Sequence, residues 1–197
     1  MKLVKFFILT LLFMSINSCL DRNLDEIKNI PTIGNEQSYT IFNWNRIGFH
    51  FNNQLGHNSK PIKVPKDVEI LMLDIKYQSV DYFYFKKFNR WFNDLIFENG
   101  IMPINQNETL DCDNFAMLYK SLFSVGAYAS DNLHEFAVAS VVVTQKNEFG
   151  GIPSGGGLHM VNLIFTTKDW YIFEPQTGEY IELENYPNQE YIQFIIL

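Results

Sequence analysis

The chain contains only two cysteines in 197 residues, so a network of disulfide bonds cannot hold it together. Clusters of lysine and arginine are also missing, and 15 basic residues face 22 acidic ones, which gives a net charge of −7. An acidic chain of this kind is a poor candidate for binding nucleic acid. Beyond the N-terminal leader no apolar run is long enough to span a bilayer. We therefore expect neither a nucleic-acid-binding protein nor a protein that crosses the membrane several times.

The N-terminus has the order of a secretory signal: two lysines, an apolar run at residues 6–14, and small polar residues before Cys19. The last four residues of this segment, Ile-Asn-Ser-Cys, resemble a bacterial lipobox, which implies a lipid on Cys19. Residues 1–18 would be a lipoprotein signal peptide, residues 19–37 a lipidated tether, and residues 38–197 a single domain. An ordinary signal peptide and an N-terminal anchor helix are the alternatives. We expect a bacterial cell-envelope protein, facing the periplasm or the cell surface, with a lipid anchor in the membrane.

The rest of the composition is that of a globular domain, with 47% hydrophobic and 16% aromatic residues. Apolar residues recur at three- and four-residue steps between residues 79 and 98, which predicts an amphipathic helix. A second helix should begin near Asp111 and end at Gly126. Segments rich in β-branched residues follow, so the predicted fold class is α+β, with helices before an antiparallel sheet. The strands are expected at residues 136–144, 159–166, 170–174 and 180–183.

Residues 37–78 are harder to interpret. Residues 39–42 and 70–77 fit strands or short helices, whereas residues 52–65 are rich in Asn, Gly and Pro and fit a loop. This part of the chain either covers a cleft as a lid or completes the hydrophobic core.

Cys112 is the only thiol expected to remain free once Cys19 carries a lipid. An exported protein with one free thiol either buries it as an inert residue or uses it. Cys112 falls in the first turn of the second helix, where free backbone N–H groups and the helix dipole favour the nucleophilic thiolate. Asp111 and Asp113 oppose this by direct charge, although carboxylates also cap helices. From this position alone, an inert thiol beneath Phe115 and a catalytic thiol both remain open.

A thiol enzyme needs a general base that is oriented by a third group. His159 opens a predicted strand directly after a glycine-rich loop. If the following tight turn pairs Phe165 with Trp170, His159 lies opposite Gln176 and shares its face with Glu174, its diagonal neighbour. A slip of one residue would separate the two side chains. Taken singly, a histidine at a strand start is more often a surface or capping residue, and a glutamate at a strand end is usually exposed.

Three motifs resemble, in order and spacing, the transglutaminase-like branch of the papain-like superfamily of cysteine proteases and acyltransferases. They are Asp-Cys-Asp-Asn-Phe-Ala at residues 111–116, His-Met-Val-Asn at 159–162, and Trp-Tyr-Ile-Phe-Glu-Pro-Gln at 170–176. The resemblance covers residues 109–178. It implies a papain-like fold in which the helix that bears the cysteine packs on an antiparallel β-sheet. One departure is the glutamate in the third motif, where aspartate is commoner.

The same resemblance implies that the catalytic residues are Cys112, His159 and Glu174. The histidine would take the thiol proton, the thiolate would attack an amide or ester carbonyl, and water or an amine would release the thioester. Glu174 would hold the imidazole tautomer, and no cofactor or metal is required. The residues expected to line the site are Asp111, Asp113, Trp170 and Gln176.

Two other functions stay open. An NlpC/P60-like peptidoglycan endopeptidase also opens a helix with Asp-Cys, although Ser-Gly usually follows there and Asp113-Asn114 fits poorly. A non-catalytic ligand-binding module on the same fold would use the same polar residues without turnover. The expected partner is a peptide or protein substrate in the envelope, and the oligomeric state is open. Three histidines show no paired spacing with other ligand residues, so no zinc site is expected at His50, His57 or His134.

Overall fold

The computed structural model of the chain describes residues 30–32, 41–43, 65, 68–71, 76–100, 111–130 and 135–197. The chain divides into two compact units, Met1–Ile30 and Pro31–Leu197, and only Ile30 of the first unit is described. The signal peptide and the lipid on Cys19 fall outside the described residues, so both stay predictions. No helix in the described ranges is long and apolar enough to cross a membrane.

The described residues of the second unit form nine strands, two α-helices and two short 3-10 helices. In chain order they are β1 (Ile41–Asn43), β2 (Glu69–Leu71), β3 (Lys76–Gln78), α2 (Tyr82–Glu98), α3 (Cys112–Ala129), β4 (Glu135–Phe136), β5 (Val138–Thr144), β6 (Leu158–Phe165), β7 (Trp170–Phe173), β8 (Tyr180–Glu182), η1 (Leu183–Asn185), η2 (Gln189–Tyr191) and β9 (Ile192–Ile196). Strands β1, β3 and β4 form a small sheet. The other six strands form a larger sheet with the order β2-β9-β5-β6-β7-β8.

Four neighbouring strands of the larger sheet, β5 to β8, follow one another in the chain and are antiparallel, as their β-branched and aromatic residues predict. Phe165 pairs with Trp170 across the β6–β7 hairpin, and this confirms the register proposed from the short connection between them. The C-terminal strand β9 adds antiparallel to β5, and β2 adds parallel to β9. The last strand of the chain therefore lies inside the sheet.

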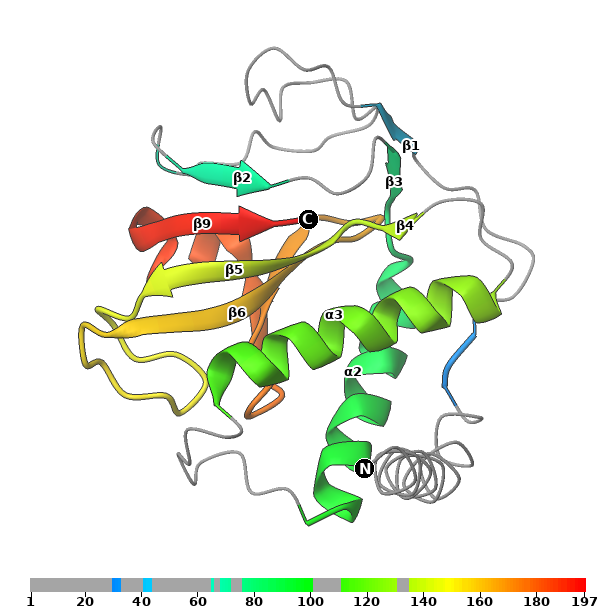
Figure 1. Cartoon of the computed structure of the whole chain (residues 1–197), viewed down its shortest axis with the longest axis horizontal. Helices are drawn as coiled ribbons and strands as arrows, with labels where there is room; N and C mark the ends of the chain where they lie inside the picture. The colour runs from blue at the N-terminus through cyan, green and yellow to red at the C-terminus, as the bar shows by residue number, and fades with distance from the viewer. Residues whose placement is uncertain are drawn as a thin grey trace, which may run out of the picture. The chain divides into compact units, whose positions relative to one another are not determined.

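The two faces of this sheet bury different partners. Helix α3 contacts β5 and β6, and Figure 1 shows it running along β6 with α2 crossing behind it. Side chains alternate along β6, so Val161 and Leu163 point away from α3. They belong to a core cluster that also contains Leu183 and Tyr186 from the C-terminal segment.

Aromatic side chains join the two helices to each other and to the sheet. The ring centroids of Phe88 and Phe123, one from each helix, are 4.0 Å apart. Tyr119 of α3 stacks on Phe173 of β7 with centroids 4.5 Å apart. All four rings are fully buried, so the position of α3 on the sheet depends on close packing of large side chains.

Gly126 lies inside α3 rather than at its end, because the helix continues to Ala129. The residue packs against the Tyr84 hydroxyl and the carbonyl of Pro31, and a Cβ at this position would collide with that hydroxyl. The hydroxyl donates a hydrogen bond to the Pro31 carbonyl at 2.8 Å. The glycine is therefore needed for a close approach, and the prediction that it stops the helix was wrong.

The predicted fold class was also wrong. An α+β, papain-like or transglutaminase-like arrangement, with helices before one antiparallel sheet, does not describe nine strands in two sheets against two helices in the described residues. The error came from pairing between distant segments. Strands β2 and β3 precede the helices, yet they pair in parallel with β9 and β4, which follow them. Hydrophobic periodicity reports local structure and carries no information on such pairing.

Replacing Phe92 with alanine should lower the free energy of unfolding by about 3–5 kcal/mol, because its ring is fully buried against Tyr119 and Phe173. Phe97 lies on the same helix but is 81% exposed, so Phe97→Ala should change it by less than about 0.5 kcal/mol. Urea denaturation of the two variants measures the difference. Equal losses would contradict the burial of the aromatic interface.

Candidate functional site

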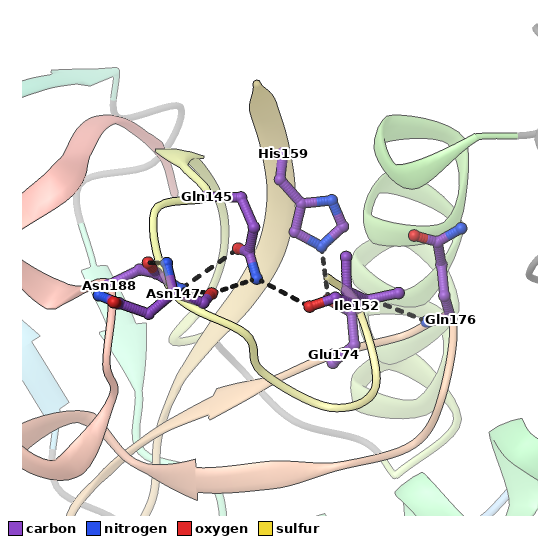
Figure 2. Close-up of polar contacts among 7 residues, drawn as sticks. All are labelled: Gln145, Asn147, Ile152, His159, Glu174, Gln176 and Asn188. Carbon is purple, nitrogen blue, oxygen red and sulfur yellow. Dashed lines mark hydrogen bonds and ion pairs between the residues drawn. The ribbon is translucent and has the colours of Figure 1, made fainter. Parts of the chain in front are cut away.

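His159 and Glu174 form a buried pair where β6 begins and β7 ends (Figure 2). The imidazole Nε2 lies 2.6 Å from Glu174 Oε2, and the two side chains are 7% and 0% exposed. The register of the β6–β7 hairpin brings them to the same face, as the pairing of Phe165 with Trp170 predicts. An imidazolium and a carboxylate at this distance form a charge-assisted hydrogen bond.

Cys112, the first residue of α3, hydrogen-bonds to His159. Because Nε2 faces Glu174, the thiol meets the other ring nitrogen, Nδ1. Burial lowers the pKa of His159, but the hydrogen bonds and the charges of Cys112 and Glu174 raise it from 6.5 to about 9. The ring is therefore protonated at neutral pH. Cys112 is a free and half-buried thiol, so it is the member of the cluster that solvent reaches most easily.

A tight turn after β7 fixes the orientation of the Glu174 carboxylate. Its Oε1 accepts a hydrogen bond of 3.0 Å from the backbone N–H of Gln176. The backbone N–H of Glu174 donates to the carbonyl of Glu179, and that of Gly178 donates back to the carbonyl of Glu174, both at 2.8 Å. Gly178 has a φ of 81°, and a Cβ there would collide with Asn93 of α2. Both carboxylate oxygens therefore have a partner, and the turn holds them.

The tip of the glycine-rich loop between β5 and β6 packs on this turn. Phe149 and Ile152 exchange two backbone hydrogen bonds of 3.2 and 3.0 Å, and Gly150 and Gly151 between them have φ values of 59° and 74°. Such a two-residue turn favours glycine at both positions. A Cβ on Gly150 would lie 3.2 Å from the Cβ of Glu174, whereas a Cβ on Gly151 would meet nothing within 4 Å. The loop therefore contacts Glu174 through Gly150.

Two buried amide side chains hold the base of the loop. Gln145 Nε2 donates to the carbonyls of Asn147 at 2.9 Å and Ile152 at 3.5 Å. Asn188 Oδ1 accepts from the N–H groups of Lys146 at 3.0 Å and Asn147 at 2.7 Å, and its Nδ2 donates to Gln145 Oε1 at 3.3 Å. Figure 2 shows this network in the same view as the imidazole–carboxylate pair. The loop base is thus bonded to the C-terminal segment.

The first turn of α3 carries acidic groups on both sides of Cys112. The backbone N–H of Asp111 donates to Asn114 Oδ1 at 3.2 Å. Asp111 Oδ1 is buried and has no hydrogen-bond partner in the part of the chain that the structure describes. The pKa of Asp113 is raised, first by a hydrogen bond with the Asp111 carboxyl group and then by burial and by the charge of Asp111. The start of α3 therefore offers a hydrogen-bond acceptor next to the thiol.

The other residues expected to line the site lie in different places. Gln176 binds Glu174 through its backbone and is 9% exposed. Trp170 lies at the far end of the β6–β7 hairpin, buried against Phe165 with ring centroids 4.5 Å apart. Among the described residues, no group of three or more His, Cys, Asp or Glu side chains is arranged to hold a metal ion. Three histidines lie outside the described residues: His50, His57 and His134.

Sequence reasoning missed three buried amides near the site. Gln145 and Asn188 hold the loop base, and Asn162 joins β6 to α3 through the carbonyl of Ala116. Asn162 could have been identified from the sequence, because it is a polar residue within the apolar segment Val-Asn-Leu-Ile of a predicted strand. Nothing in the sequence marks Gln145 and Asn188 as buried, since polar residues in turns are usually exposed.

No family model and no curated protein matches the chain. One similar solved structure, described as a PSL1a-E64 complex, matches with 16% identity and a TM-score of 0.47, over 68% of this chain and 44% of that chain. Another is Polyporus squamosus lectin bound to the human-type influenza-binding epitope Neu5Aca2-6Galb1-4GlcNAc. It matches with 16% identity and a TM-score of 0.45, over 67% of this chain and 43% of that chain. The chain therefore spans less than half the length of either structure.

These findings correct the family and the function expected from the sequence. Membership in the transglutaminase-like branch was wrong: no family model matches the chain. The predicted hydrolase or acyltransferase with a thioester intermediate was wrong as well, whereas the location in the cell envelope stays a prediction. Nothing in the comparisons supports a lipoprotein signal peptide either. The resemblance rested on three short motifs, and a hydrogen-bonded cysteine, histidine and carboxylate do not by themselves define a reaction.

Gly150→Ala should lower the free energy of unfolding by about 2 kcal/mol or more, because a Cβ at a φ of 59° is strained and presses on Thr177 and Glu174 of the turn. Gly151→Ala is the matched control. It has the same kind of backbone strain with nothing to collide with, so it should cost about 1 kcal/mol. Thermal or urea denaturation compares the two. If both substitutions cost the same, the tip does not press on the turn.

Glu174→Gln should lower the pKa of His159 from about 9 by one unit or more, because it removes the negative charge while burial remains. A folded-state pKa raised above 6.5 contributes stability below pH 6.5, and this contribution is lost as pH rises through about 9. Glu174→Gln should therefore flatten the fall in stability across this range. NMR titration of the ring and urea denaturation from pH 6 to 10 test both statements. An unchanged titration would show that the carboxylate does not hold the imidazolium.

Proposed function

We propose that the chain is a non-catalytic ligand-binding module whose ligand binds at the cluster of Cys112, His159 and Glu174. One observation carries the proposal: the His159 imidazole, 7% exposed, lies 2.6 Å from the Glu174 carboxylate, 0% exposed, and this carboxylate helps to raise the pKa of the ring. Removing two charges from water costs several kcal/mol, and apolar side chains of similar volume are often more stabilising. A ligand contact explains this pair better than the stability of the domain does.

The site is also arranged before any ligand arrives, which favours binding because little has to be ordered. The turn fixes the carboxylate through Gln176, and the loop tip packs on Glu174 through Gly150. The Nε2 side of the imidazole is therefore occupied. A ligand would meet the ring from the Nδ1 side, next to the half-buried thiol of Cys112.

The surrounding charges favour a neutral ligand with hydrogen-bonding groups. The chain has a net charge of −7, and Asp111 and Asp113 flank the cysteine, so an anionic ligand would be repelled. The protonated ring of His159 would repel a cation. Glu174 and Cys112 take up the hydrogen bonds of the ring, so the polar groups at this site are the half-buried thiol and Asp111 Oδ1, an acceptor without a partner among the described residues. Hydroxyl and amide groups, which both donate and accept, suit this combination, and a neutral N-acetylated saccharide carries both.

Titration of N,N′-diacetylchitobiose, a neutral disaccharide with hydroxyl and amide groups, into the 15N-labelled protein tests this proposal. We expect saturable shifts of the backbone amide signals of Cys112 and Gln176. Glu174→Gln should weaken binding about tenfold, because the charge that helps to hold the imidazole against the Cys112 thiol is lost. Glu179→Gln is the matched control, since this exposed residue closes the same turn through its backbone. It should leave the affinity unchanged.

Two results would contradict the proposal in different ways. Absence of a saturable shift at millimolar disaccharide would exclude a neutral saccharide as the ligand class. A cleaved or transferred product in the same sample, detected by mass spectrometry, would overturn the non-catalytic assignment.

A further inference from the structure

Asn162 is a buried polar residue outside the cluster that contacts the proposed ligand. It is fully buried in the middle of β6, between Val161 and Leu163. Its Nδ2 donates to the carbonyl of Ala116 at 2.9 Å and to that of Ala139 at 3.3 Å. Ala139 belongs to the neighbouring strand β5 and Ala116 belongs to α3. The amide therefore fastens the helix to the sheet.

The bond to Ala116 holds the helix turn that begins with Cys112. The two residues are four positions apart, so they lie on one helix face about 6 Å apart along the axis. On the sheet side, Asn162 follows His159 by three positions in β6. Strand and helix are therefore joined twice, once by the thiol and imidazole and once by the amide and the helix carbonyl.

This double connection makes the thiol contact sensitive to the position of the helix. His159 lies at the start of β6 and Cys112 at the start of α3, so their side chains meet only when α3 begins at one place along β6. A slide of α3 along β6 would therefore move the thiol away from the imidazole.

We infer that Asn162 is a positioning residue of the binding site, whose amide sets where α3 begins along β6 and so holds Cys112 against His159. The inference rests on the proposed function in one respect, namely that this cluster binds the ligand. Ser140 of β5, directly paired with Asn162, approaches the same carbonyl with its Oγ at 3.4 Å. Two strands thus supply donors to one carbonyl of α3, which also accepts the regular bond of the helix.

Stability does not account for the choice of asparagine at this position. Its Oδ1 is buried and has no hydrogen-bond partner within the described ranges. A buried polar atom without a partner is destabilising, whereas an apolar side chain of similar size leaves no such atom. What the amide adds over leucine is the directed bond to Ala116.

Asn162→Leu in the full chain tests the inference through His159, independently of any ligand. NMR titration should give a ring pKa lower than the wild-type value of about 9 by roughly one unit, because the contact with Cys112 is lost while burial remains. The urea midpoint should stay the same or rise. The rate at which iodoacetamide alkylates Cys112, measured by peptide mass spectrometry, should depend on pH differently from the rate in the wild type. Affinity for N,N′-diacetylchitobiose should fall about tenfold.

Ser140→Ala is the matched control, because it removes the longer of the two bonds to the same carbonyl. It should shift the His159 titration less than Asn162→Leu does. If the leucine variant does not fold, Asn162→Ser removes the amide with a smaller side chain. The same fall in the His159 pKa is expected for this variant. A folded variant in which His159 titrates as in the wild type would overturn the inference. A shifted titration in a protein whose wild type does not bind the disaccharide would leave the positioning role standing and reject the proposed ligand.

Discussion

The hydrogen bond between His159 and Glu174 is the interaction around which this end of the sheet is arranged. A buried ion pair persists only when each charge has its partner and the remaining hydrogen-bonding capacity is used. The register of the β6–β7 hairpin meets the first condition, because it puts the two residues on one face. The turn meets the second, since the N–H of Gln176 binds the other carboxylate oxygen. The glycine loop packs on the same turn through Gly150.

The aromatic interface beneath α3 connects the His159–Glu174 pair to the two helices. Tyr119 stacks on Phe173, the residue before Glu174, and its hydroxyl donates to Asn89 of α2 at 2.5 Å. Helix, strand and turn are thus in direct contact. Packed aromatic rings resist small displacements, because a shift of one ring must be accommodated by its neighbours. The thiol and the imidazole therefore project from elements that close packing holds, which is the arrangement a binding site with little reorganisation needs.

The sequence predicted those features that depend on neighbouring residues. The β6–β7 register followed from a short turn and period-two alternation, and it correctly put His159 and Glu174 on one face. Pairing between β2 and β9 was not predictable, because the two strands lie at opposite ends of the domain and pair in parallel. Gly126 was misread because the clash that requires it involves Tyr84, more than 40 residues away. Close approach in space leaves no periodic trace in a sequence.

The protonation of His159 bears both on binding and on the chemistry first inferred from the motifs. That mechanism required His159 to take a proton from Cys112, and a general base works best with a pKa near the working pH. Burial opposes protonation, yet the hydrogen bonds and charges of Cys112 and Glu174 raise the pKa of His159 to about 9. A ring that is protonated at neutral pH also fits a thiolate–imidazolium pair, so this pKa does not distinguish binding from catalysis. The bonded ring serves recognition by fixing the positions of the carboxylate and the thiol, so that little has to be ordered when a ligand binds. Carboxylate, imidazolium and thiol in hydrogen-bonded order are therefore compatible with binding and do not by themselves specify turnover.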